Sequence, residues 1–381
     1  MAASCVCGSV LNRFRCSAAG LIRISAARSQ IKNVIEDTHV TQRQKHSTCW
    51  SEVSEHVSRA GGGGGAGGRG GGVLWAALAF SLFSSSDEDH RDEAQRKEDE
   101  IILLLKKAKL SVHRGLFDAA AAFLHQAVAL AHQTNNNQAI IYSYSLMANL
   151  AYVQGQLDNA EKLFKATMNV MLSGGTSQDD NAVIEMSLKL ATIYAKQNKA
   201  ELAEHGFRFC TESLEEKLQK HTEEDESLRK ETRLLLGLCL DSRARYRASK
   251  LHLKEARDDY ETALKICSQE QGEIHPQTLV LMSDLATILD LQGRHDDALA
   301  LVQQAVDLSR SSGHPDQHIV LGNMAGILLH KGRLDDAFQF YHEALSLAQR
   351  VGDQDAVDNI QDGLKEVKKR REQETRETKE D

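Results

Sequence analysis

Cysteine thiols are the side chains of this sequence most suited to nucleophilic attack or metal binding. Seven cysteines occur, and none form a Cys-x-x-Cys pair, the spacing that structural zinc sites and redox pairs use. Cys5 and Cys7 lie in the basic head, so they are separate from the helical body. Cys210 stands at a small-residue position of the helical pattern described below. We therefore expect Cys210 to be a buried apolar residue. The cysteine spacing also indicates that the protein is not trapped in its compartment by oxidation of paired thiols.

The sixteen histidines could bind a metal, but their spacing does not favour it. His314 and His318 are four residues apart, yet a proline directly after His314 places it in a linker. His342 precedes a glutamate without the second histidine of a His-Glu-x-x-His zinc motif. His125 and His132 lie on a predicted helix and are expected at its surface. With no nucleophile elbow, kinase motif set or dinucleotide loop either, we predict no catalytic residue, no metal site and no cofactor.

The composition indicates an all-helical protein. Of 381 residues, 41% are hydrophobic and only two are proline, and the glycines are concentrated in one tract. Sandwiches and barrels need turns rich in Gly and Pro throughout the chain, so these folds are disfavoured. The net charge is −8, which provides no basic field for nucleic acid. The charge is uneven, with +5 in residues 1–86 and −13 in the remainder.

The N-terminal head has the composition of a mitochondrial presequence. Residues 1–35 contain five arginines and lysines and no Asp or Glu, and they are rich in Ala and Ser. An ordinary disordered basic terminus is the alternative. No apolar stretch typical of a secretory signal follows the first arginines. We assign residues 1–60 to a presequence and disordered head.

A short apolar segment follows a glycine tract. Residues 61–72 include ten glycines and predict a flexible tether. Residues 73–86 contain the apolar run VLWAALAFSLF, which at about 1.5 Å per residue is shorter than a bilayer core of about 30 Å. Arginines before it and acidic residues after it favour a segment arrested in the inner membrane, with the repeats facing the intermembrane space. The alternative is a buried apolar patch of the soluble domain. Residues 87–100 form the expected acidic linker.

The body of the chain is a repeat. Five segments match the pattern Gly/Asn-x-x-Asp/Glu-x-Ala, and they begin at Gly115, Gly155, Asn198, Gly293 and Gly332. A small residue lies seven positions before each start, a large apolar residue nine positions after it and another small residue twelve positions after it. Gly or Asn can adopt the left-handed conformation that ends a helix, and the acid suits the N-cap or first turn of the next helix. Small residues allow close helix contact, so the pattern predicts helix-turn-helix pairs.

A sixth copy, which is the fourth along the chain, keeps the small and large residues but has Leu251 in place of the Gly and Lys254 in place of the acid. We expect an irregular turn there. The long spacing before this copy marks an insertion at residues 211–233, expected to lengthen two charged helices, with a mobile tip near residues 221–226. Six repeats are thus expected over residues 101–352, followed by a closing helix and frayed tail over residues 353–381.

These features resemble the tetratricopeptide repeat, a helical solenoid. The spacings of 39 to 53 residues exceed the common repeat of about 34, and a His-Pro pair two residues before two first helices resembles the kinesin light chain branch. Stretches such as SLMANLAYVQGQLDNAEKLFKATM and HPQTLVLMSDLATILDLQGRHDDA further resemble a mitochondrial family of such proteins. That resemblance implies an inner-membrane scaffold that binds respiratory complex III, including its Rieske iron–sulfur subunit and core subunits, and promotes clearance of Rieske N-terminal fragments. The sequence specifies no oligomeric state.

A stack of helix pairs exposes its first helices on a concave groove, the candidate partner site. Two groove positions lie ten and six residues before the Gly or Asn. In repeats two, three, five and six they are Ser145 and Asn149, Leu188 and Thr192, Ser283 and Thr287, and Gly322 and Gly326. Repeats that grip a C-terminal carboxylate need Lys or Arg beside Asn, and only Asn149 fits. We expect a weakly polar groove for a helix or extended segment; alternatively, these small residues only permit close packing.

Two other functional classes compete with the scaffold. One is a cytosolic adaptor of the kinesin light chain kind, for which the head would be irrelevant. The other is a hydrolase of short peptides, although the sequence offers it no nucleophile or metal ligand set.

Overall fold

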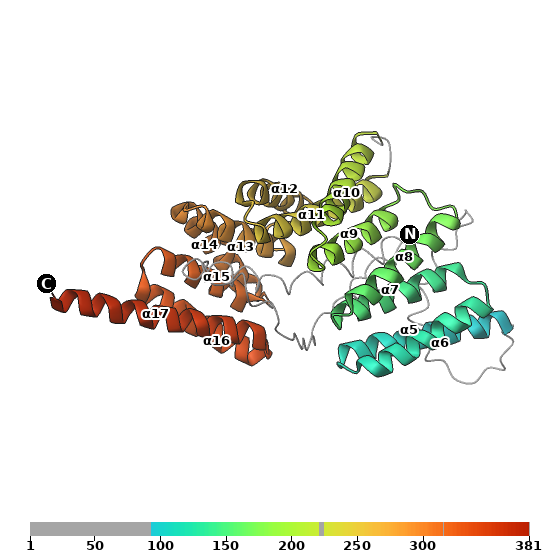
Figure 1. Cartoon of the computed structure of the whole chain (residues 1–381), viewed down its shortest axis with the longest axis horizontal. Coiled ribbons are helices and arrows are strands. Elements are labelled where there is room, and N and C mark those ends of the chain that lie inside the picture. The colour runs from blue at the N-terminus through green and yellow to red at the C-terminus, as the bar shows by residue number, and fades with distance from the viewer. Residues whose placement is uncertain (1–92, 221–224, 315, 381) are drawn as a thin grey trace. The chain divides into compact units, whose positions relative to one another are not determined.

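The structure is a computed structural model that describes residues 93–220, 225–314 and 316–380. These ranges form thirteen helices and contain no strand, which confirms the all-α prediction (Figure 1). The expected presequence and head (1–60), glycine tether (61–72) and apolar segment (73–86) lie outside the described residues. Among the helices that are described, none combines the length and apolarity needed to cross a bilayer.

The described residues divide into two compact units. Unit 1, residues 93–220, contains six helices that pack in consecutive pairs: α5 (Glu93–His113) with α6 (Phe117–Gln133), α7 (Asn137–Val153) with α8 (Leu157–Ser173), and α9 (Asn181–Lys196) with α10 (Ala200–Lys220). Helix α5 begins inside the expected acidic linker, because the polar residues before Ile101 continue the same helix.

Unit 2, residues 225–380, contains seven helices. Three pairs are α11 (Glu226–Ser249) with α12 (Leu253–Gln271), α13 (Pro276–Leu291) with α14 (His295–Ser312), and α15 (Gln317–His330) with α16 (Leu334–Val351). The last helix, α17 (Gln354–Glu380), packs on α16 and α15 and closes the stack. It extends to Glu380, over the residues expected to form a frayed tail.

The repeat pattern correctly predicts the core. The small and large residues that define the repeats are almost completely buried in both units; they include Ala148, Phe164, Cys210, Tyr260, Ala286 and Tyr341. Helices of a pair approach closely where these small residues meet. At Gly206 of α10, for example, an added Cβ would lie 2.8 Å from the Cβ of Ala191 in α9, a distance that real Cβ atoms essentially never show. Packing of alanine against glycine therefore joins α9 and α10.

The turn within each pair has one geometry. Gly155 has φ of +75°, and the amide N–H groups of Gly155 and Gln156 donate to the carbonyls of Tyr152 and Ala151, which ends helix α7. The prediction of an irregular turn in the sixth copy is wrong. Leu251 has φ of +62°, and the amides of Leu251 and His252 make the same two bonds to Ala248 and Arg247. The surrounding helix packing imposes the turn on a leucine, for which the left-handed conformation costs about 1–2 kcal/mol.

The acidic residue of each repeat stands at the second position of its helix. Helix α8 begins at Leu157, so Asp158 lies one residue inside the first turn, and the N-cap, Gln156, makes no side-chain capping bond. The acid also binds the following element in three places. Asp158 accepts a hydrogen bond from Gln197 at 2.7 Å, Asp296 is paired with Lys331, and Asp335 is paired with Arg371 of α17. These three acids therefore join their own repeats to the element that follows.

The insertion lengthens two helices as expected. Helix α10 has 21 residues and α11 has 24, compared with 14 to 19 in the helices from α12 to α16. Residues 221–224 of the expected tip lie outside the described residues. Asp225 and Glu226 do not belong to a tip, because the Asp225 side chain accepts from the amide of Ser227 and caps α11.

Candidate functional site

In unit 1 the predicted groove residues bond to their own helices. The Asn149 side chain donates to the carbonyl of Ser145 at 2.8 Å, and the Thr192 hydroxyl donates to the carbonyl of Leu188 at 2.9 Å. Ser145 and Leu188 are buried, whereas Asn149 and Thr192 are half-buried. Asn149 and Thr192 are therefore the members of this set with exposed surface.

In unit 2 the predicted groove residues are buried, and a side-chain hydrogen bond links α13 to α15. The Asn323 side chain of α15 donates to the hydroxyl of Ser283 in α13 at 2.8 Å, and the Thr287 hydroxyl donates to the carbonyl of Ser283. Gly322 and Gly326 lie on α15 and are buried as well. Asn323 was not among the predicted residues, although it directly follows Gly322.

Asp241 and Arg245 are the groove residues that the sequence analysis missed. They stand ten and six residues before Leu251, the same offsets that define the groove in the other repeats. The offsets could have found them had they been applied to the degenerate copy. Arg245 donates to Asp241 through Nε at 3.0 Å and through Nη2 at 2.7 Å, and Gln277 of α13 also donates to Asp241. Arg245 does not create a carboxylate clamp, because its charge is already matched by Asp241.

Asp284 of α13 is the third charged member of this group. Its carboxylate lies 3.7 Å from Arg245 Nη2 and is completely buried. Burial raises the pKa of Asp284 to about 7, with the attraction of Arg245 opposing and the repulsion of Asp241 adding to that effect. Near neutral pH, Asp284 therefore exchanges between a neutral and a charged form.

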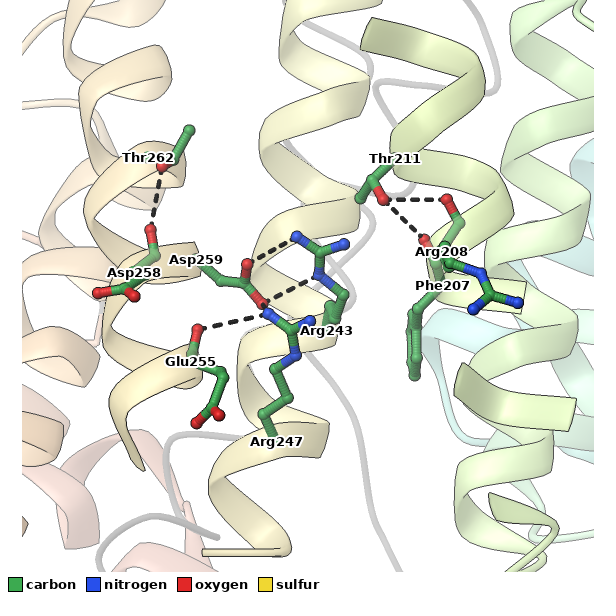
Figure 2. Close-up of polar contacts among 9 residues, drawn as sticks. All are labelled: Phe207, Arg208, Thr211, Arg243, Arg247, Glu255, Asp258, Asp259 and Thr262. Atoms are coloured by element: carbon green, nitrogen blue, oxygen red, sulfur yellow. Dashed lines mark hydrogen bonds and ion pairs between the residues drawn. The ribbon is translucent and has the colours of Figure 1, made fainter. Parts of the chain in front are cut away.

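A second ion cluster lies on the α12 side of α11. Asp259 accepts from Arg243 through both of its oxygens, at 2.7 and 3.0 Å, and Arg247 donates to the same carboxylate at 2.6 Å (Figure 2). Arg247 also reaches the carbonyl of Glu255 at 3.5 Å. Three arginines thus alternate along α11. Arg245 pairs with Asp241, whereas Arg243 and Arg247 join α11 to α12 through Asp259.

A third buried carboxylate joins repeats five and six. Asp290, at the end of α13, contacts His295 of α14 at 2.7 Å through one oxygen and His330 of α15 through the other. Unit 2 thus contains three completely buried aspartates, at positions 241, 284 and 290.

The titratable groups near these clusters are poor nucleophiles. Burial raises the pKa of the Cys267 thiol to about 12, so the thiolate is scarce at neutral pH. Burial also raises the pKa of Tyr260 well above its usual value. Asp284 could exchange a proton near pH 7, but the side chains around it are an ion pair and a buried phenol rather than an activated hydroxyl or thiol.

The residues considered for metal binding have other roles. His318 contacts Asp353 at 3.1 Å, and the His314 ring accepts from the amide of Asp316 at 2.9 Å. Within the described ranges, no three His, Cys, Asp or Glu side chains are grouped in a way that could hold a metal ion. His125 and His132 are exposed, as expected, and Cys210 is fully buried.

Comparison with known proteins identifies the family. Tetratricopeptide repeat models match residues 252–311 and 320–351, both within unit 2. The chain is 69% identical over 271 residues to "Tetratricopeptide repeat protein 19, mitochondrial" of Danio rerio, an alignment that covers 70% of this chain and 67% of the relative. This chain belongs to the tetratricopeptide repeat protein 19 family. The Homo sapiens member of the family is 52% identical over 210 residues, covering 54% of this chain and 55% of the human protein.

A solved structure agrees with the fold. A signal transduction ATPase with a tetratricopeptide repeat sensor from Pyrococcus horikoshii aligns with a TM-score of 0.51 at 12% identity, covering 72% of this chain and 40% of that chain. The likeness is one of architecture. The chain spans about two thirds of the zebrafish family member and about half of the human one.

Proposed function

We propose that this chain is a non-enzymatic interaction scaffold of the inner mitochondrial membrane that binds respiratory complex III and supports its integrity. Its 69% identity to the zebrafish mitochondrial protein carries the proposal. The partners are the Rieske iron–sulfur subunit and core subunits of the complex, and the outcome is clearance of Rieske N-terminal fragments. A separate protease cuts the fragments, since the buried, protonated thiol of Cys267 is unsuited to that chemistry.

Crosslinking with mass spectrometry in intact mitochondria tests the association. We expect crosslinks from unit 1 or unit 2 to subunits of complex III. A chain lacking residues 1–60 is the matched control, because it keeps both units and loses the proposed import signal. Crosslinks confined to proteins unrelated to complex III would contradict the proposal.

The proposed topology places the N-terminus in the matrix and the repeats in the intermembrane space. The charge change around residues 73–86 supports it, with Arg59 and Arg69 on one side and an acidic run on the other. Protease added to mitochondria with ruptured outer membranes should digest the repeats. Survival of the repeats until the inner membrane is dissolved would place them in the matrix instead.

Import should remove the head. Terminal-peptide analysis of the protein from mitochondria should find no residue from 1 to 28, because a presequence is cleaved after entry. Recovery of intact Met1 from the same preparation would rule out this step.

A cytosolic adaptor of the kinesin light chain kind is the second candidate. The long repeat spacing and Pro276 at the first position of α13 favour it. Fusing residues 1–86 to a fluorescent reporter separates the two functions, because only the mitochondrial scaffold needs an import signal. For the hydrolase, incubation of the pure chain with Rieske N-terminal peptides should yield no cleavage products.

A further inference from the structure

One side of helix α5 exposes leucines and basic residues together. This side, the α5 face, consists of Leu103, Lys106, Lys107 and Leu110 of the helix and Arg114 directly after it, and all five are exposed. The last four lie three, four, seven and eleven positions after Leu103, the spacing of residues on one side of a helix. Leu103 is 45% exposed and Leu110 48%, whereas the opposite side of α5 is buried in the core of unit 1.

The α5 face lies at the end of a helical stack, where a repeat protein needs a polar outer surface to stay soluble. In unit 2 the last pair is covered by α17. Among the described residues, no helix precedes α5. Its two exposed leucines are followed in the next turn by Leu116, which is 54% exposed. The α5 face therefore differs from a polar cap and has the character of a binding surface.

The charge of the α5 face is opposite to that of the body of the chain. Residues 101–116 contain Lys106, Lys107, Lys109 and Arg114 and no Asp or Glu, whereas the chain from residue 87 carries a net charge of −13. The acidic residues of α5 all precede this stretch. None of the described carboxylates forms an ion pair with these four cations, and two of the lysines lie over aromatic rings of α6 and α7. The face is therefore complementary to an anionic partner.

An anionic membrane surface offers both of the contacts that the α5 face needs. Its headgroups attract lysine and arginine, its acyl region accepts leucine, and long basic side chains extend their charges back to the headgroups. A second copy of the chain would place the same basic face against itself, which like charges oppose. A lipid surface combines the negative charge with an apolar layer beneath it.

The position of α5 in the chain brings it close to a bilayer. Only residues 87–92 separate it from residues 73–86, the segment proposed to lie in the inner membrane. These six residues span at most about 20 Å. Helix α5, with 21 residues, is about 32 Å long, so a helix lying along the bilayer surface places residues 103–116 on the headgroups.

We infer that the α5 face docks on an anionic phospholipid surface, with Lys106, Lys107 and Arg114 on the headgroups and Leu103 and Leu110 entering the apolar layer. The inference rests on the proposed inner-membrane location and deepens it. The apolar segment is shorter than a bilayer core, and the α5 face supplies a second attachment beside it. Two weak attachments on one chain bind far more tightly than either alone.

Binding of the full chain to lipid vesicles tests the charge of the α5 face. Vesicles of phosphatidylcholine with about one third phosphatidylserine are compared with vesicles of phosphatidylcholine alone by sedimentation. The double variant Lys106→Gln, Lys107→Gln should bind the anionic vesicles about tenfold or more weakly than the parent and the neutral vesicles equally well. Raising the salt from about 50 to about 500 mM should reduce this difference, because salt screens the attraction.

The matched control is the double variant Lys368→Gln, Lys369→Gln. Both lysines are exposed on α17, and their loss changes the net charge equally. This control should bind anionic vesicles as the parent does. The basic head at residues 1–35 is present in every variant, so its own attraction to lipid cancels in the comparison.

The leucines of the α5 face give a second test. Leu103→Gln, Leu110→Gln should weaken binding to anionic vesicles about tenfold, because two apolar side chains no longer enter the membrane. Both leucines are exposed, so the variant should melt at the temperature of the parent. Leu202→Gln, Leu228→Gln is the control, since it alters exposed leucines of α10 and α11 and should leave the binding unchanged.

A photoreactive phospholipid in the same vesicles locates the contact. After illumination of the unmodified chain, peptides from residues 101–116 should carry lipid adducts. Adducts on residues 73–86 report the proposed membrane segment separately, so the failure of one attachment is distinguished from the failure of the other. Crosslinks to complex III in intact mitochondria test the proposed function independently of both.

Three results would overturn the inference. The first is a Lys106→Gln, Lys107→Gln variant that binds anionic vesicles as tightly as the parent. The second is lipid adducts on residues 73–86 with none on residues 101–116. The third is a crosslink from residues 101–116 to residues 73–86, to a second copy or to an acidic protein that persists in the presence of anionic vesicles, which would identify a different occupant of the face.

Discussion

Units 1 and 2 share one repeat pattern but join successive repeats differently. In unit 1 the joints lie at the surface: Lys196 of α9 lies 4.3 Å above the ring of Tyr152 in α7, and Lys199 pairs with Glu161 of α8 at 3.1 Å. Unit 2 has surface joints as well, such as Lys331 with Asp296, but it adds a buried one, in which Arg245 of α11, bonded to Asp241 of the same helix, contacts Asp284 of α13. Water screens surface ion pairs, so they contribute little to stability. Removing one partner of a buried pair is strongly destabilising, because it leaves a buried charge uncompensated.

The pKa values of Glu161 in unit 1 and Asp284 in unit 2 shift in opposite directions. Hydrogen bonds, chiefly from Lys165 and then from Lys199, lower the pKa of Glu161 to about 2, against the opposing effect of burial. Burial raises the pKa of Asp284 to about 7. The environment therefore stabilises the ionised form of Glu161 and the neutral form of Asp284, because Glu161 keeps contact with water and with two ammonium groups, whereas Asp284 is completely buried.

The largest effect is expected where a buried pair is broken. Arg245→Met should lower the free energy of unfolding by about 3–5 kcal/mol, because it leaves Asp241 and Asp284 without their cation. Lys199→Met in unit 1 is the control and should cost less than about 1 kcal/mol. Urea unfolding measures both, and equal effects would remove the proposed difference between the units.

Asp284→Asn should stabilise the protein in a pH-dependent way. The folded pKa of Asp284 lies above its unfolded value, so the folded state binds the extra proton, and stability falls as pH rises from about 4 to 7. The substitution removes that loss, which could reach about 4 kcal/mol at pH 8 and is small below pH 4. Thermal unfolding at several pH values measures the change. A variant that melts below the parent at pH 8 would contradict this account.

Ala148→Leu tests the apolar packing of unit 1. Ala148 is fully buried at the close contact within repeat two. Three added carbons should lower the stability by about 1–3 kcal/mol through overpacking. An unchanged melting temperature would show that the repeat pattern is misassigned there.

Leu251→Gly tests the strained turn of unit 2. Glycine relieves the left-handed strain at φ of +62° but adds entropy to the unfolded chain, so a net gain of about 0.5–1 kcal/mol is expected. Leu251 is largely exposed, so little apolar burial is lost. Denaturant midpoints compare the variant with the parent, and a loss of stability would mean that the leucine side chain itself stabilises the turn.

The smallest effect is expected at the surface joint of unit 1. Glu161→Gln should change the stability at pH 7 by less than about 1 kcal/mol, because Lys165 and Lys199 are about half exposed. The lowered pKa means that the stabilisation is present above about pH 4.5 and is lost as pH falls towards 2. Acid unfolding curves of parent and variant should therefore converge near pH 2, and a constant difference down to that pH would exclude the ion pairs as its cause.

The sequence by itself predicted the helix pairs, because short-range spacing determines them. Ala148, Phe164 and Cys210 are buried where the repeat pattern placed them, and Gly155 ends its helix as the left-handed residue. The pattern also placed Ser283 and Thr287 at groove positions. It gave no sign that Asn323 of the next repeat donates to Ser283, because that bond joins residues 40 positions apart.

Tertiary structure alone decided two features. The first is the turn at Leu251, where helix packing imposes the regular geometry although the sequence lacks the glycine that would favour it. The second is the environment of the charged residues, because nothing in the sequence distinguishes Asp241 and Asp284 from other acidic residues. Only the packed structure shows that Asp241 is paired with Arg245, whereas Asp284 is buried without a hydrogen-bond donor among the described helices. Burial and charge pairing depend on residues distant in the chain, whereas helix and turn propensities depend on neighbours.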